Sequence, residues 1–254
     1  MPEVIISGQS GRLEGRYHQS LNPKAPVALV LHPHPLHGGT MNNKVTYSLY
    51  KSFANNGFSV LRINFRGVGK SQGKFDNGIG ELQDATVALN WLHSQNMDAP
   101  TFWVSGFSFG AWIGLQVVMR RPDIEGYILA APPATKYDFN FIVPCSASGM
   151  VIQGDKDDIS KEYDTLKVVE KLASREEAEI NYQIIGGADH FFRSQMEEFE
   201  QITDKYIKDR LLQDSGKVRK VKRDRRRRRK KKGSVAQKSE THVSPVKSLL
   251  SWDN

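Results

Sequence analysis

The stretch Val104-Ser105-Gly106-Phe107-Ser108-Phe109-Gly110-Ala111 decides the fold of this chain of 254 residues. An apolar run over 101–105, typical of a strand, leads directly into Gly-x-Ser-x-Gly, and a helix-like run over 111–120 follows. A strand that turns at once into a helix forces the turn residue into a strained conformation with its side chain projecting outward. The glycines leave room for the neighbouring strand and helix. We therefore predict that Ser108 is a catalytic nucleophile.

Strand-like and helix-like segments alternate on both sides of this turn. The predicted strands are an N-terminal hairpin over 4–6 and 13–17, followed by 26–31, 58–63, 101–105, 126–130, 149–153 and 179–184. The predicted helices cover about 43–55, 80–94, 109–120, 160–174 and 192–212. This alternation is typical of an α/β fold with a mostly parallel, doubly wound sheet, here with an antiparallel N-terminal hairpin.

The formal net charge of +8 belongs to the C-terminal end of the chain. Residues 213–254 carry 15 Lys and Arg against 4 Asp and Glu, whereas residues 1–212 carry 21 against 24, a net charge of −3. Like charges at this density repel and cannot bury a core, so we predict a catalytic domain over 1–212 and a disordered tail over 213–254. The basic block over 217–232 is either a solvated extension or a non-specific contact for nucleic acid or an anionic membrane surface.

Two features of the sequence bear on location. Cys145 is the one cysteine, so an internal disulfide is impossible and a reducing compartment fits. The first residues lack the basic and apolar segments of a secretory signal, and no apolar run is long enough to cross a bilayer. We expect a cytoplasmic protein without a transmembrane segment.

A serine hydroxyl becomes a nucleophile when a base removes its proton and a carboxylate orients that base. On this fold the partners follow the serine in the order Asp or Glu, then His, each in a loop after a later strand. His190 lies in the glycine-rich loop after the predicted strand over 179–184, before an aromatic pair and a helix. We therefore predict that His190 is the base.

Three acids follow the predicted strand over 149–153 and compete for the orienting role. Asp157 lies far enough past the strand end to reach over the sheet edge toward the imidazole, and it is our choice. Asp155 points outward or accepts amide hydrogens within the turn. Asp158 faces solvent or caps the following helix.

Acyl transfer also needs two N–H donors for the negative charge that develops on the carbonyl oxygen. One is the backbone N–H of Phe109, the residue after the nucleophile. The other should come from the loop after the strand over 26–31. Pro33 and Pro35 have no N–H, which leaves His34 as the best donor and Leu36 as the second.

Two motifs suggest other chemistry, but each is incomplete. The histidines of 32–37 approach the His-x-His-x-Asp-His pattern of dinuclear zinc hydrolases, but Leu36 stands at the acidic position. The segment ending at Ser71 approaches a phosphate-binding loop, but Asn64 replaces its first glycine and no helix is predicted after it. We therefore expect neither a metal nor a cofactor.

Together the motifs resemble the α/β-hydrolase superfamily, in particular a group of small bacterial serine hydrolases without a lid. The resemblance covers residues 1–212 and is carried by His32-Pro33-His34-Pro35 with Gly38-Gly39-Thr40, Asn64 to Ser71, Gly106 to Gly110, Gly154-Asp155-Lys156-Asp157 and Ala188 to Phe192. It implies that the orienting acid is Asp157, at the fourth position of Gly-x-x-Asp. The basic tail has no counterpart in that group.

The connection over 131–146 is too short to form a cap domain. Its prolines and the aromatic residues Tyr137, Phe139 and Phe141 can instead wall a small acyl pocket, which favours a small soluble ester as substrate. We predict a carboxylesterase-like serine hydrolase that acts through an acyl-enzyme. The alternatives are a peptidase or dienelactone-type hydrolase with the same triad, or a polyanion-binding protein with a vestigial hydrolase scaffold.

Overall fold

The computed structural model describes residues 2–143, 146–174 and 178–213. The chain divides into two units, residues 1–207 and 208–254. Of the second unit only 208–213 is described, and it is helical. The predicted disordered tail therefore lies outside the described residues, apart from Gln213, and so does Cys145.

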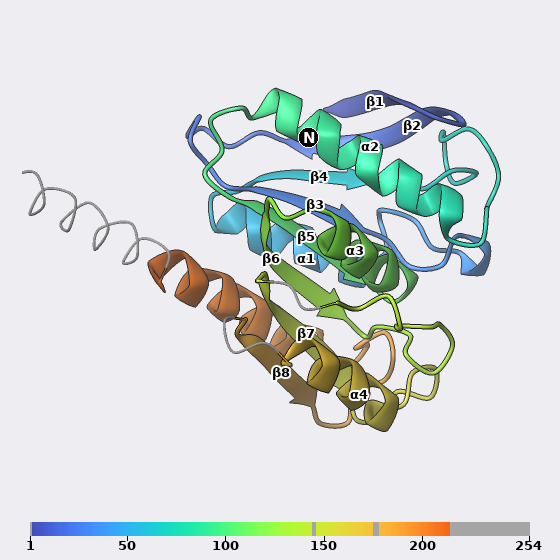
Figure 1. Cartoon of the computed structure of the whole chain (residues 1–254), viewed down its shortest axis with the longest axis vertical. Helices are drawn as coiled ribbons and strands as arrows, with labels where there is room; N and C mark the ends of the chain where they lie inside the picture. Colours follow the sequence, from blue (N-terminus) through green and yellow to red (C-terminus); the bar gives the residue numbers. More distant parts are fainter. Residues whose placement is uncertain (1, 144–145, 175–177, 214–254) are drawn as a thin grey trace, which may run out of the picture. The chain divides into compact units, whose positions relative to one another are not determined.

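Eight strands form one sheet in the spatial order β1-β2-β4-β3-β5-β6-β7-β8 (Figure 1). Their bounds are β1 (Glu3–Gly8), β2 (Gly11–His18), β3 (Val27–Leu31), β4 (Ser59–Ile63), β5 (Phe102–Phe107), β6 (Ile124–Ala130), β7 (Ser148–Gly154) and β8 (Ile180–Ile185). The hairpin β1–β2 is antiparallel and joins β4 in antiparallel register, while every later pairing is parallel. The predicted fold class is confirmed.

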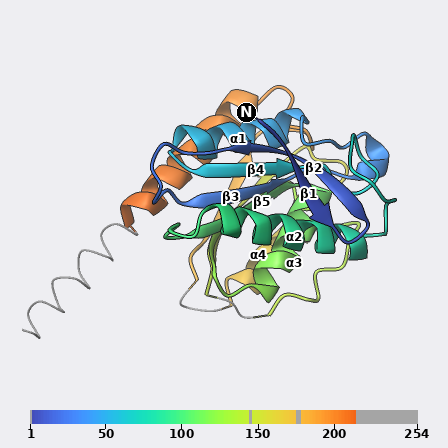
Figure 2. The ribbon, with the colours of Figure 1, turned by 90° about the horizontal axis from the view of Figure 1, so that it is seen from above.

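Helices cover both faces of the sheet. They are α1 (Lys44–Asn55), α2 (Ile79–Gln95), α3 (Phe109–Arg120), α4 (Glu162–Leu172), a further helix that begins at residue 196, and the short 3₁₀ helix η1 (Pro35–His37). Figure 2 shows α1 and the helix from residue 196 on one face, with α2, α3 and α4 on the other. Helix α1 and the helix from residue 196 are joined by a hydrogen bond of 2.8 Å from Ser48 Oγ to Glu200 Oε1. Coverage on both faces explains why every residue of β3 is buried.

One predicted boundary is wrong. The last helix begins at residue 196, not at Phe192. Phe192 adopts a left-handed conformation with φ of 53°, which interrupts a helix. The Asp189 carboxylate accepts hydrogen bonds from the amides of Phe191 and Arg193 and so stabilises a separate turn.

The parallel arrangement decides where the loops meet. Because β3, β5, β6, β7 and β8 run in the same direction, their carboxyl ends share one edge of the sheet. The segments that follow them therefore converge there. These segments contain every residue predicted to act in the site.

Candidate active site

Ser108 occupies the turn between β5 and α3, with φ of 54° and ψ of −119°. Its amide donates to the carbonyl of Ala130 at 2.9 Å, which ties the turn to the end of β6. A Cβ on Gly106 would lie 2.2 Å from the carbonyl oxygen of Gly110, and one on Gly110 would lie 2.4 Å from that of Leu31. Side chains at these two positions would collide with backbone, as the sequence predicts.

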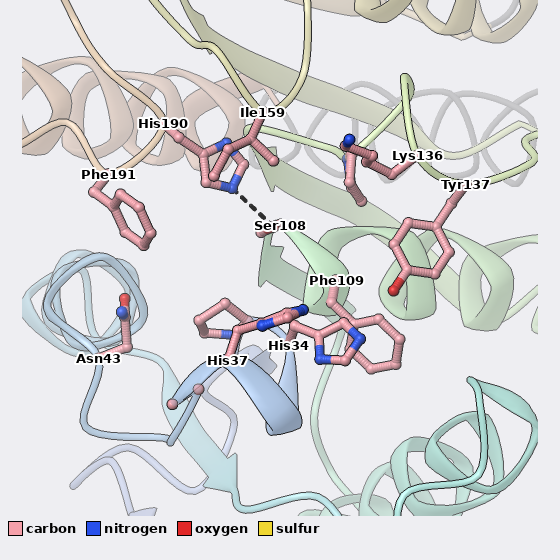
Figure 3. Close-up of a pocket in the computed structure, with 14 residues that line it drawn as sticks. His34, His37, Asn43, Ser108, Phe109, Lys136, Tyr137, Ile159, His190 and Phe191 are labelled. Atoms are coloured by element: carbon pink, nitrogen blue, oxygen red, sulfur yellow. Dashed lines mark hydrogen bonds between the residues drawn. The ribbon is translucent and has the colours of Figure 1, made fainter.

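The structure brings Ser108, His190 and Asp157 together. His190 Nε2 lies 2.9 Å from Ser108 Oγ, and His190 Nδ1 lies 2.7 Å from Asp157 Oδ2 (Figure 3 draws the first contact). All three side chains are buried, with Ser108 the most accessible at 8%. The Asp157 oxygen can only accept, so the proton lies on Nδ1 and Nε2 is the acceptor for the serine O–H.

Asp157 is held by four donors. Its Oδ1 accepts the amides of Ile159 at 2.9 Å and Ser160 at 2.8 Å, and its Oδ2 accepts Gln153 Nε2 at 2.9 Å as well as His190. Burial acts to raise the pKa of Asp157, but hydrogen bonds and the charge of His190 outweigh it and lower that pKa below its usual value. The carboxylate is therefore ionised and oriented before substrate arrives.

The other two candidate acids lie away from the imidazole. Asp155 is exposed, and its Oδ1 accepts the amide of Gly187 at 2.6 Å, in the neighbouring loop and not within its own turn. Asp158 is exposed, and the N-cap of α4 is Lys161. Of the three acids, the structure places Asp157 alone against His190.

Gln153 is a residue of the site that the sequence analysis missed. It is the residue before the last in β7, where every residue is buried, and the sequence gives it the pattern of an ordinary strand residue. Only the folded chain shows its amide beside Asp157. Its Nε2 also donates to the carbonyl of Ser160 at 2.9 Å, and its Oε1 accepts from Thr165 Oγ1 at 3.1 Å. Gln153 therefore positions the acid.

We expect Gln153→Leu to lower kcat by roughly tenfold to a hundredfold, the cost of one lost hydrogen bond to a charged group. The KM should stay unchanged, since Gln153 does not line the cavity that opens beside Ser108. Steady-state kinetics on a 4-nitrophenyl ester measure both values. Gln183→Leu, at a partly exposed position on β8, is the control; equal kcat in the two variants would contradict the role of Gln153.

The two residues predicted to supply the oxyanion donors line the same cavity beside Ser108. Phe109 is the first residue of α3, and His34 precedes η1. Within the described part of the chain, no acceptor is bonded to the main-chain N–H of either residue. The alternative donor, the amide of Leu36, is occupied by His34 Nδ1 at 3.1 Å. Of these two candidate donors, the contact leaves the amide of His34 available.

His32 holds the peptide bond that carries this amide. Its ring is fully buried, with Nδ1 2.6 Å from the carbonyl oxygen of Pro33 and Nε2 3.0 Å from the amide nitrogen of Phe65. The C=O and N–H of a trans peptide point in opposite directions, so this bond aims the His34 N–H away from His32. Burial lowers the pKa of His32 to about 4, although the bond to Pro33 acts to raise it.

This lowered pKa predicts a loss of stability in acid. His32 gains its proton near pH 6.5 in the unfolded chain and near pH 4 in the folded one. The contribution of neutral His32 to the free energy of unfolding is therefore complete above pH 6.5 and is lost progressively toward pH 4. Between about pH 7 and pH 5 the free energy of unfolding should fall by about 2 kcal/mol on this account. Urea unfolding of wild type and His32→Gln measures it: the variant should lack this component, and the exposed control His93→Gln should keep it.

A cavity of about 640 Å³ opens beside Ser108. It is lined by Pro33, His34, His37, Gly38, Gly39, Asn43, Ser108, Phe109, Pro133, Lys136, Tyr137, Ile159, His190 and Phe191 (Figure 3). Tyr137 and Pro133 form part of its wall as predicted, whereas Phe139 and Phe141 do not line it, so the prediction is wrong for these two residues. Lys136, Asn43 and Ile159 were not predicted, because no motif marks the segments that carry them.

Two further findings concern the described residues. They contain no group of three or more His, Cys, Asp or Glu side chains arranged to hold a metal ion. None of their helices is both long and apolar enough to cross a membrane.

Comparisons with known proteins identify the family. The sequence model of the X-Pro dipeptidyl-peptidase (S15) family matches residues 21–142. The structure of an Agrobacterium tumefaciens protein of unknown function, described as a proposed α/β hydrolase, is 48% identical with a TM-score of 0.81, covering 83% of this chain and 97% of that one. An α/β serine hydrolase homologue from Coxiella burnetii is 32% identical with a TM-score of 0.74, covering 81% and 96%.

A third structure, from Xanthomonas campestris, is described as an α/β serine hydrolase without a lid. It is 29% identical with a TM-score of 0.72, covering 82% of this chain and 94% of that one. These likenesses extend over most of each chain and agree with the resemblance carried by the sequence motifs. The chain belongs to the α/β-hydrolase superfamily, among its serine hydrolases.

Proposed function

We propose that this serine hydrolase cleaves small carboxylic esters through a triad of Ser108, His190 and Asp157. The observation that supports the proposal is the unbroken hydrogen-bonded line from Ser108 Oγ through both ring nitrogens of His190 to Asp157 Oδ2. A hydroxyl, an imidazole and a carboxylate in this order are the groups that acyl transfer requires.

The reaction follows from this geometry. Ser108 Oγ attacks the ester carbonyl while His190 Nε2 takes its proton, and Asp157 stabilises the resulting imidazolium. The amides of His34 and Phe109 bind the oxyanion. The tetrahedral intermediate collapses as Nε2 returns the proton to the leaving alcohol, which gives an acyl-enzyme. Water then attacks the acyl carbon as Nε2 takes one of its protons. The second tetrahedral intermediate collapses as Nε2 returns that proton to Ser108 Oγ, which releases the acid and restores the Ser108 hydroxyl.

A peptidase is the second candidate, favoured by the match of residues 21–142 to the X-Pro dipeptidyl-peptidase family. An enzyme that removes an N-terminal dipeptide must accommodate a free ammonium group, for which a carboxylate is the natural partner. None of the described residues that line the cavity is Asp or Glu. This charge pattern supports the ester over the peptide.

A fluorophosphonate probe tests the proposal, because only an activated serine reacts with it. We expect the probe to label wild-type protein at Ser108, as located by mass spectrometry, and not to label Ser108→Ala. In parallel, 4-nitrophenyl esters of increasing acyl length and an X-Pro amide are offered to the same preparation. Turnover of short esters with no cleavage of the amide supports an esterase, and the reverse supports the peptidase. A protein that is not labelled and turns over neither substrate class is not an enzyme of this kind.

The division of the chain into domains is part of this proposal. We place the hydrolase within residues 1–212, since every residue assigned a role here lies between residues 32 and 190. The basic segment over 217–232 lies outside the described residues.

A further inference from the structure

One wall of the cavity beside Ser108 carries a lysine. Lys136 lines the cavity with Pro133 and Tyr137, in the segment that follows β6 (Figure 3). Within the described part of the chain, no carboxylate is ion-paired with its ammonium group. Among the 14 lining residues drawn in Figure 3 there is one Lys and no acid. The cavity therefore presents a cation that the folded domain does not neutralise.

The wall that carries this lysine is held in place from several sides. The Lys136 amide donates to the carbonyl of Pro133 at 2.9 Å, and Ser160 Oγ donates to that of Pro132 at 2.6 Å. Trp112 Nε1 donates to the carbonyl of Asp138 at 2.9 Å. These bonds hold the backbone on both sides of Lys136 before any ligand arrives, which reduces the ordering cost of binding.

The N-terminal ends of two helices add partial positive charge at the same cavity. Helix α1 begins directly after Asn43 and α3 begins at Phe109, so the positive ends of two helices meet the cavity that Lys136 lines. Residues 1–212 as a whole carry a net charge of −3, so this local sign is opposite to that of the surrounding domain. A positive recess in an acidic domain attracts anions selectively.

Two acids that contact or act on residues of the cavity, Asp157 and Glu81, are engaged by other groups. Asp157 lies behind His190 and is paired with it. Glu81 acts on the Tyr137 hydroxyl, whose pKa is raised by burial and by that negative charge, but both Glu81 oxygens accept amides, those of Asp76 and Gly78. Tyr137 therefore remains a neutral hydrogen-bond donor on the same wall.

We propose that the preferred ester of this enzyme carries an anionic group, and that Lys136 binds it. The inference rests on the proposed esterase function and adds the substrate class. A contact between an ammonium group and an anionic oxygen that lies away from the scissile carbonyl is made equally in the ground state and the transition state. It therefore lowers KM for anionic esters and leaves kcat nearly unchanged.

Matched pairs of esters measure this preference. Mono-4-nitrophenyl adipate and its neutral terminal carboxamide differ only in charge, and they place that charge on the acyl side. The acetyl esters of 4-hydroxybenzoate and 4-hydroxybenzamide place it on the leaving group. The readout is the ratio of kcat/KM for the anionic ester to that for its neutral partner, after subtraction of hydrolysis without enzyme.

We expect this ratio to exceed unity in wild type for at least one pair. It should fall about fivefold in Lys136→Met, the size of a partly solvated charge contact, and further in Lys136→Glu. The change should lie in KM. It should also shrink between about 0.01 M and about 1 M salt, as the Debye length falls from about 30 Å to about 3 Å. Lys161→Met is the matched control, since Lys161 is exposed, lies outside the cavity and is joined through its amide to Thr135, the neighbour of Lys136.

The outcomes separate the two proposals. If wild type cleaves the neutral esters through Ser108 but both ratios are the same in Lys136→Met, Lys136→Glu and Lys161→Met, the role of Lys136 is wrong and the esterase proposal stands. If no ester of either charge is cleaved, the esterase proposal fails and the inference fails with it. A ratio that falls only in the Lys136 variants supports the anionic substrate, and the pair that responds shows which half of the ester carries the charge.

Discussion

Replacing Ser108 with alanine should lower kcat/KM for 4-nitrophenyl acetate by about 100,000-fold, close to the rate without enzyme. The methyl group cannot attack the carbonyl, and His190 Nε2 loses the hydroxyl that lies 2.9 Å away. The amides of His34 and Phe109 remain, so a small residual stabilisation of the oxyanion persists. Initial rates at several enzyme concentrations measure the loss.

The control for this variant is Ser94→Ala. Ser94 is exposed at the end of α2 and donates to the carbonyl of Trp91, far along the chain from the sheet edge that carries the site. This variant should keep wild-type kinetics. Activity in Ser108→Ala above about one part in a hundred of wild type, in a preparation that the fluorophosphonate probe does not label, would mean that another group attacks the ester.

The fold was predictable because its signals are local. Continuous apolar runs mark strands that are buried on both faces, as for Val27–Leu31, and Gly-x-Ser-x-Gly marks the turn where β5 passes into α3. The start of the last helix was not predictable from the same signals. The pattern of apolar residues continues through Phe192, and the positive φ there depends on the turn closed by Asp189.

The residues of the site likewise fall into those that local sequence patterns predict and those that they do not. Ser108, His190 and Asp157 lie in loops with recognisable glycine patterns, at strand ends that a parallel sheet brings to one edge. Gln153 and Lys136 lie in a strand and in a connection that carry no such pattern. Their roles depend on side chains from different elements that meet only in the folded chain, and local sequence patterns do not reveal such contacts.

The second large effect concerns Asp157→Asn, which should lower kcat by about 10,000-fold. In the wild type, Oδ1 accepts the amides of Ile159 and Ser160, and Oδ2 accepts His190 Nδ1–H. The backbone amides of Ile159 and Ser160 cannot become acceptors, whereas His190 can change tautomer. An asparagine therefore keeps its oxygen toward the two amides, and its NH₂ group faces the imidazole and the Gln153 side chain. Nδ1 then has to accept, the ring proton moves to Nε2, and Nε2 can no longer take the proton of Ser108.

The kinetic signature distinguishes this cause from a general loss of structure. The kcat and the rate of fluorophosphonate labelling should fall together, because both need Nε2 as an acceptor, while KM for a neutral ester changes little. Far-UV circular dichroism confirms that the variant is folded. Asp158→Asn, one residue away and exposed, should retain wild-type rates. If Asp157→Asn stays within about tenfold of wild type while Asp155→Asn is inactive, the orienting acid is Asp155, and the contact between His190 and Asp157 is structural only.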